Sequence, residues 1–186
     1  QVAAHAAQNF LGKDVLLIHV LSASAAEMKM IAAAGSPVSV SPGSDLRIGF
    51  GFTKTAEFLD AGITVGVSVD TTALSGNASL FGQLKKIREI ENAKNHDEFK
   101  ISARQMLELG TIEGARSLGL GDQIGSLKPG KRADIIMVST QHLNMGVFTN
   151  PSHMLVEATL PENVDTVVVD GRILKRAGKL TSLSTK

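Results

Sequence analysis

The sequence predicts an α/β fold, in which short apolar strands alternate with helices. Val65–Asp70 reads V-G-V-S-V-D, and this alternation of small and β-branched residues is typical of a buried strand. Val15–Val20 reads V-L-L-I-H-V, another short apolar run, and a loop and the helical stretch Ala25–Ala34 follow it. The 43% hydrophobic content and the formal net charge of +1 suit a globular chain with no tendency to bind nucleic acid.

Further elements are predicted by local signals along the chain. Gly35-Ser36-Pro37 interrupts the helical pattern and precedes a short apolar strand. Leu80, Leu84 and Ile87 recur at helical spacing, which predicts an amphipathic helix. The expected order is helix 1–10, strand 15–20, helix 25–34, strand 37–41, a glycine-bearing loop 42–51, helix 54–59, strand 63–69, helices 79–92, 101–109 and 111–118, strand 133–138, helix 150–158 and a strand pair within 164–174.

Both of the first two apolar runs carry a polar side chain at or near their end. Asp70 stands where the strand gives way to the loop T-T-A-L-S-G-N, and His19 lies near the end of the other run. In a barrel of parallel strands, the carboxyl ends of the strands carry the chemistry. The two residues are therefore a candidate metal or acid–base pair. Taken alone they leave alternatives open, because such an aspartate is often a helix cap and such a histidine is often a core residue.

The C-terminal third contains three ordered motifs. Residues 111–138 include G-A-R-S-L-G-L and I-G-S-L-K-P-G-K-R-A-D-I, and Val164–Val169 leads into Asp170-Gly171, a pair typical of a two-residue hairpin turn. Together the motifs resemble the amidohydrolase superfamily, in its cytosine deaminase and chlorotriazine hydrolase branch, over residues 14 to 180. The motifs themselves are scaffold. The resemblance implies that residues 1–122 are the C-terminal half of a (β/α)8 barrel and that residues 123–186 supply strands of a small β-sandwich domain.

The resemblance also implies a metal and a reaction. Enzymes of this branch hold one divalent metal, usually zinc or iron, through an H-x-H pair on the first strand, a histidine on the fifth and an aspartate on the eighth. Asp70 matches that aspartate, and His19 matches a further histidine at the end of the sixth strand. We therefore expect both residues to be catalytic and to contact the metal. The implied reaction is deamination of an amino-substituted heterocycle by metal-activated water.

Several positions differ from the sequence motifs of this branch, and we expect them to line the substrate pocket. Ser22 replaces a second histidine, Ser39 lies in V-S-V-S-P where many relatives have a histidine motif, and Asp45 stands at an asparagine position. Asn77, in the loop after Asp70, completes the predicted substrate-binding set. The substrate is therefore predicted only as a class, a purine, pyrimidine or triazine.

The H-x-H pair and the fifth-strand histidine have no counterpart in this sequence. The other histidines fall outside strand ends: His5, His96, His142 and His153. We expect the chain to be the C-terminal piece of an enzyme more than twice as long, and the isolated chain to bind no stoichiometric zinc and to lack activity. Its first strand should form an exposed edge, which predicts association with the missing N-terminal half or with a second copy.

Two rival interpretations keep the same scaffold. One is a truncated barrel without catalysis, and the other is a hydrolase of cyclic amides or imides. The sequence has no cysteine, which excludes disulfides and cysteine-bound zinc. The absence of a membrane-length apolar run and of a signal-peptide pattern predicts a cytoplasmic protein with a small-molecule substrate and no membrane or nucleic-acid partner.

Overall fold

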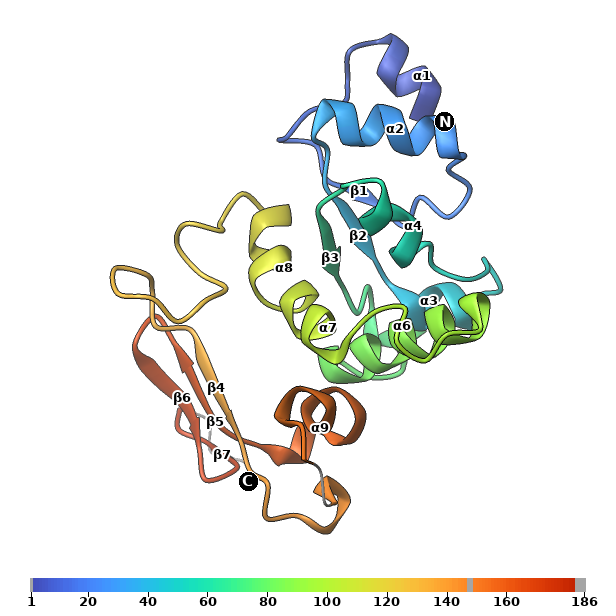
Figure 1. Cartoon of the computed structure of the whole chain (residues 1–186). Helices are drawn as coiled ribbons and strands as arrows, with labels where there is room; N and C mark the ends of the chain where they lie inside the picture. Colours follow the sequence, from blue (N-terminus) through green and yellow to red (C-terminus); the bar gives the residue numbers. More distant parts are fainter. Residues whose placement is uncertain (1, 147–148, 183–186) are drawn as a thin grey trace.

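Three parallel strands form the first of two sheets in the computed structural model, which describes residues 2–146 and 149–182 (Figure 1). They are β1 (Leu17–Ile18), β2 (Val38–Val40) and β3 (Val65–Val67), in the order β1-β2-β3. Ile18 pairs with Ser39, which pairs with Gly66. The α/β prediction is confirmed, and β1 lies at an edge of the sheet as expected. The strands are shorter than predicted.

Helices cover this sheet. Their bounds are α1 (Val2–Ala7), α2 (Ala25–Ala34), α3 (Pro42–Arg47), α4 (Thr55–Asp60), α5 (Thr72–Ser75), α6 (Leu80–Asn95), α7 (Ala103–Leu109) and α8 (Ile112–Ser117). The prediction for α2 has the observed bounds, because a capping box of Ser24 and Glu27 begins the helix and Gly35, at φ 73°, ends it.

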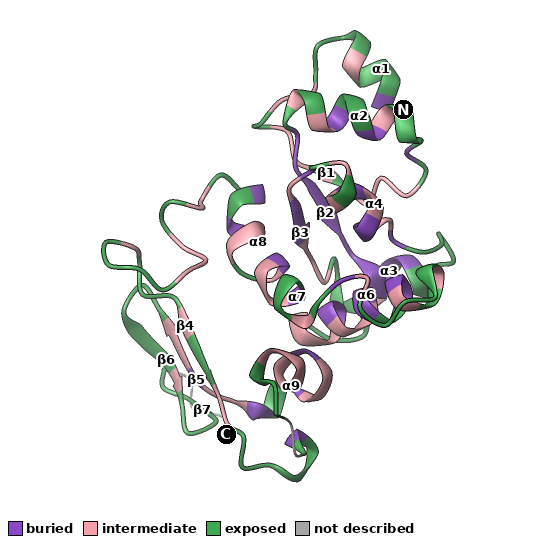
Figure 2. Cartoon of the chain, in the orientation of Figure 1, coloured by how far each residue is buried: buried purple, intermediate pink, exposed green. Residues whose placement is uncertain are grey.

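The core lies on one face of the parallel sheet. Val38, Val40 and Val65 have no exposed surface, and they pack with Phe58 and Ile31 from the helices; Figure 2 shows these strands as buried. Gly66, next to the core residue Val65 in β3, lies against α8. A Cβ atom added to Gly66 would lie 2.5 Å from Ser117 Oγ. Glycine therefore permits the close approach of this helix to β3.

The prediction of a loop over residues 42–51 is wrong for the first half of this segment, which forms α3. The text P-G-S-D is typical of a turn, but Pro42 also suits the first position of a helix, where its missing N–H costs nothing. The buried N–H of Gly43 donates to Gln83 Oε1 of α6 at 2.8 Å. Packing against α6, which local sequence does not reveal, therefore decides between turn and helix.

The second sheet is antiparallel and has the order β4-β5-β6-β7. Its strands are β4 (Ile135–Val138), β5 (Val164–Val169), β6 (Arg172–Arg176) and β7 (Lys179–Leu180), of which β7 was not predicted. Asp170 and Gly171, with φ of 51° and 77°, form the predicted two-residue turn. Before β5 lie η1 (Leu143–Met145), α9 (Pro151–Ala158) and η2 (Pro161–Asn163).

Helix α9 packs against α6 and α7, two of the helices that cover the parallel sheet (Figure 1). An apolar cavity of about 500 Å3 separates it from β4. Among the described residues, no helix has both the length and the apolar character needed to cross a membrane.

Candidate active site

The predicted site residues lie at the carboxyl edge of the parallel sheet. His19 directly follows β1, Asp70 lies three residues beyond β3, and Asp45 lies in the first turn of α3, which begins soon after β2. The three elements run in one direction, so their ends meet at one edge of the sheet. His19 and Asp45 are in direct contact, and the charge of Asp70 acts on the Asp45 carboxyl group.

The backbone is strained where β1 and β3 end. His19, Val20 and Asp70 have φ of 64°, 52° and 60°, in the left-handed region that residues other than glycine seldom adopt. A β-branched residue such as Val20 is the least suited to it. Such a conformation costs on the order of 1–3 kcal/mol per residue and clusters at functional sites. Its presence at two of the three strand ends supports a functional role for this edge.

His19 and Asp45 form a partly buried pair. His19 Nδ1 lies 2.9 Å from Asp45 Oδ1; the imidazole is 29% exposed and the carboxyl group has no exposed surface. The distance is that of a charge-assisted hydrogen bond, although the ring N–H is not aligned with the oxygen, and Asp45 Oδ2 has no hydrogen-bond partner among the described residues. Burial raises the pKa of Asp45, the nearby His19 opposes this shift, and the negative charge of Asp70 adds to it.

Two residues outside the sequence prediction hold this edge together. Arg47, two positions after Asp45, donates from Nη1 to the carbonyl oxygens of Ala73 and Leu74, at 2.8 and 3.2 Å, and so ties α3 to the segment after Asp70. Gln83 fixes the first turn of α3 through Gly43. Neither contact has a signal in the sequence, because both depend on which helices become neighbours.

The remaining predicted residues are spread along the same edge. Ser39 is buried in β2, and its carbonyl oxygen accepts from the N–H of His19 at 2.9 Å. Ser22 is exposed in the loop after His19. Asn77 is also exposed, and its Oδ1 accepts from the N–H of Ser79 at 2.8 Å, which shapes the turn before α6. The structure shows no contact among these three side chains, and their role in substrate binding stays a prediction.

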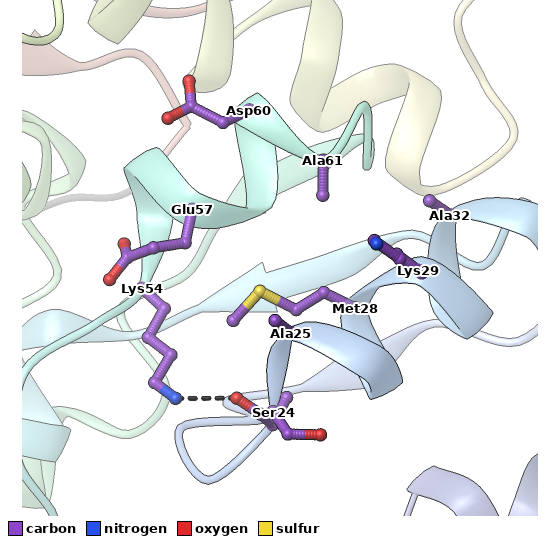
Figure 3. A pocket seen from close by; sticks show the side chains of 10 residues that line it. Ser24, Ala25, Met28, Lys29, Ala32, Lys54, Glu57, Asp60 and Ala61 are labelled. Atoms are coloured by element: carbon purple, nitrogen blue, oxygen red, sulfur yellow. Dashed lines mark hydrogen bonds between the residues drawn. The ribbon is translucent and has the colours of Figure 1, made fainter.

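Two hollows border the sheet. A groove of about 720 Å3 between α2 and α4 is lined by residues outside the predicted site (Figure 3). Lys54, which lines this groove, donates from Nζ to the Ala23 carbonyl oxygen at 2.7 Å. This bond holds the loop that begins at His19. A larger cavity, of about 850 Å3, lies between Ile18, Ser39 and the second sheet.

His19 and Asp70 carry side chains of the kinds that bind zinc. Histidine nitrogen and aspartate oxygen are both zinc donors, but a zinc site takes three or four protein ligands. Among the described residues, no three histidine, cysteine, aspartate or glutamate side chains are arranged to hold a metal ion. His19 and Asp70 therefore have suitable donor atoms for such a site, but two residues are too few to form it.

The fold agrees with comparisons to known proteins. The amidohydrolase family profile matches residues 4–174, so the chain belongs to the amidohydrolase family. It is 31% identical over 169 residues to a 5-methylthioadenosine/S-adenosylhomocysteine deaminase of Teredinibacter turnerae, covering 91% of this chain and 38% of that protein. It is 30% identical over 175 residues to a 5'-deoxyadenosine deaminase of Methanobrevibacter smithii, covering 94% and 40%. The chain thus spans about two fifths of the length of these relatives.

Solved structures show the same fold. An atrazine chlorohydrolase from Arthrobacter aurescens, complexed with zinc, superposes with a TM-score of 0.88 at 28% identity, covering 94% of this chain and 39% of that one. An adenosine deaminase from Xanthomonas campestris with bound zinc gives a TM-score of 0.92 at 24% identity, covering 99% and 45%. The predicted resemblance to the deaminase and triazine hydrolase branch is confirmed.

Proposed function

We propose that this chain is the C-terminal part of a longer, metal-dependent amidohydrolase that hydrolyses a C–N bond of an amino-substituted heterocycle. In this proposal the parallel sheet and its helices are half of a (β/α)8 barrel, and the antiparallel sheet belongs to a small β-sandwich. Support comes from the relatives, which are named as deaminases of adenine nucleosides and are more than twice as long. An adenine-type ring is therefore the substrate class that we favour.

The observation that carries this proposal is the contact of His19 with Asp45 at the edge of the parallel sheet at which Asp70 also lies. The residues come from three separate strand–helix units, and two of them sit on strained backbone. A carboxyl group without exposed surface that also feels the charge of a second acidic residue is unfavourable for folding, although the backbone of Ser41 at the start of α3 offsets part of this cost. A catalytic site explains both features.

The metal in this proposal is a single divalent ion, zinc or iron. Asp70 would supply an oxygen and His19 a nitrogen, and the other ligands would come from the part of the protein outside this chain. When bound, the metal would lower the pKa of water toward neutrality, so that a nucleophile exists at physiological pH.

The residues of this chain would handle protons and charge. The Asp70 carboxylate, exposed at the strand end, would take a proton from the attacking water and deliver it to the leaving nitrogen of the heterocycle. A ring nitrogen of His19 would accept a hydrogen bond from the attacking water and so would orient the nucleophile. The bond from Arg47 to the segment after Asp70 would hold this carboxylate in place.

The rest of the protein would cover the surfaces that this chain leaves open. Ile18 on the edge strand β1 is 52% exposed, and native proteins normally cover such an edge. The cavity of about 850 Å3 beside Ser39 lies where further strands of a barrel would pack. Association with an N-terminal half, or with a second copy, is therefore part of the proposal.

The experiment is to express the complete polypeptide that contains this chain, to measure its metal content, and to assay ammonia release from 5'-deoxyadenosine, S-adenosylhomocysteine and an aminotriazine. Asp70→Asn should abolish turnover. It should leave the melting temperature unchanged or higher, because asparagine tolerates the left-handed conformation. His19→Ala should lower the rate by about 10²–10⁴-fold, as expected for a lost acid–base group.

Asp60→Asn is the control, since Asp60 lies on α4 and pairs with Lys100, away from the strand ends. It should retain full activity. Near-normal turnover in Asp70→Asn, or a purified complete protein without metal, would contradict the proposal. Activity on cyclic amides in place of amino-heterocycles would favour the rival amidohydrolase reaction.

A further inference from the structure

Asp45 differs in its burial from three other polar residues that were predicted at the sheet edge. Its side chain has no exposed surface, whereas Ser22, Asp70 and Asn77 are exposed. A group that binds substrate must become accessible to it, and Asp45 faces His19 instead, with Oδ1 2.9 Å from Nδ1. The substrate-binding role predicted for Asp45 therefore does not suit its position.

Burying a carboxylate is unfavourable unless other groups compensate for it. In this site the compensation is partial. His19 and the backbone of Ser41 favour the charged form, but neither carboxyl oxygen has a well-aligned hydrogen bond among the described residues, and Asp70 adds a second negative charge nearby. Gly43 is anchored to Gln83 and Arg47 to the carbonyl groups of α5, so α3 holds the carboxyl group where it is. A group kept in such a position acts through the residue that it touches.

We propose that Asp45 is a positioning residue, which holds the His19 ring by its Nδ1 side and so leaves Nε2 with the free lone pair. The inference deepens the proposed function and rests on it for the role of His19. A carboxylate that accepts from one ring nitrogen fixes both the tautomer and the orientation of a histidine, and raises the basicity of the other nitrogen. The ring N–H is not yet aligned, which is common in catalytic hydrogen bonds before substrate binds.

The contact also offsets the strain at His19. A residue at φ 64° at a strand end gains little from the β1–β2 ladder beyond the single bond to Ser39. Without a partner its ring could rotate among staggered positions. Asp45 removes that freedom at a residue whose orientation the chemistry requires.

The first test is the tautomer of His19 in the 186-residue chain, read from long-range ¹H–¹⁵N correlations of the imidazole rings at a pH where they are neutral. His19→Ala assigns its signals among the five histidines. The wild-type chain should show the Nδ1–H form of His19, and Asp45→Ala should show a mixture or the Nε2–H form. Asp60→Asn, the control, should resemble wild type. An Nε2–H form in the wild-type chain would overturn the proposal, and this readout needs neither a folded variant nor activity.

The second test is kinetic and uses the complete protein. Asp45→Ala should lower kcat by about 10–100-fold, typical for loss of a partner that orients an active-site histidine, with KM changed less than about twofold. Asp45→Asn, which keeps an acceptor oxygen, should recover part of that loss. A raised KM with unchanged kcat would show that Asp45 binds substrate and would overturn the inference. An inactive wild-type protein with the Nδ1–H form of His19 would instead count against the proposed function alone.

Discussion

The two sheets of this molecule differ in what holds them together. Strands β2 and β3 of the parallel sheet are short and almost fully buried, whereas β6 and β7 of the antiparallel sheet are nearly all exposed (Figure 2). Tight turns join β5 to β6 and β6 to β7, whereas η1, α9 and η2 lie between β4 and β5; helices join the parallel strands. The first sheet therefore depends on packing against its helices, and the β5–β7 part of the second depends on local pairing and turn geometry.

This difference separates the chemistry from the scaffold. Polar site residues and strained backbone lie at the ends of the buried parallel strands, where packing from α3 and α6 can hold them. The antiparallel sheet has its left-handed residues, such as Asp170 and Gly171, only at turns that require them. At the end of β1 the strain falls in a tight turn, which the Val20 N–H closes on the Ile18 carbonyl oxygen at 2.9 Å. It falls there on a histidine and a β-branched valine, which is why we connect it with function.

The largest test of this contrast is Phe58→Ala. Phe58 has no exposed surface and packs against the parallel sheet, so its loss should destabilise the chain by about 3–5 kcal/mol. Ile173→Ala on β6 is the matched change, and because Ile173 is 37% exposed it should cost about 1 kcal/mol. Urea unfolding followed by circular dichroism measures both, and similar losses would show that the two sheets are held in the same way.

Gly66→Ala tests the contact between β3 and α8. The added Cβ would lie 2.5 Å from Ser117 Oγ and 3.3 Å from its Cβ, so we expect a loss of about 1–3 kcal/mol from overpacking. Adding Ser117→Ala removes the nearer atom and should recover part of the loss, with Ser117→Ala alone as the control. Simple additivity of the two changes would mean that the side chains do not meet.

Gly171→Ala tests the turn between β5 and β6. No atom lies within 4 Å of the added Cβ, so the cost comes only from the φ of 77° and should be about 1–2 kcal/mol. Gly82→Ala in α6 is the counterpart, since its Cβ meets only ordinary contacts and the helix gains about 0.5–1 kcal/mol. The melting temperature should therefore fall for Gly171→Ala and rise for Gly82→Ala. A lower melting temperature in both variants would show that the positive φ of Gly171 is not the cause.

The same contrast explains what the sequence could predict. The Asp170-Gly171 turn and the bounds of α2 follow from neighbouring residues, and both predictions are confirmed. Helix α3 and the Asp45–His19 contact depend on which distant elements become neighbours, so the first was predicted as a loop and the second was not foreseen. His19 and Asp70 were selected because a strand end is visible in sequence, while Arg47 and Gln83 lie on helices without such a signal.

The smallest expected effect is a difference in how the pKa values of two carboxyl groups respond to salt. One is Glu27 in α2, beside the parallel sheet, and the other is Asp170 in the turn between β5 and β6. Hydrogen bonds from the N–H groups of Ser24 and Ala3 lower the pKa of Glu27 to about 2, whereas the hydrogen bond and charge of Arg132 lower the pKa of Asp170. Both carboxyl groups favour the folded state above their ordinary pKa values of 4.5 and 3.8, and this stabilisation is lost as pH falls through the lower, folded values.

Salt at about 1 M screens exposed charges beyond roughly 3 Å and leaves short hydrogen bonds in place. In titrations followed by NMR, the pKa of Asp170 should rise part of the way toward 3.8 in high salt, because salt screens the charge of Arg132 but not its hydrogen bond, while the pKa of Glu27 should stay near its low-salt value. Arg132→Gln should reproduce the rise of Asp170 without salt and leave Glu27 unchanged. Equal salt shifts at the two carboxyl groups would show that charge contributes as much to the helix cap as to the Arg132–Asp170 pair, and would contradict the greater role that we give to backbone hydrogen bonds at Glu27.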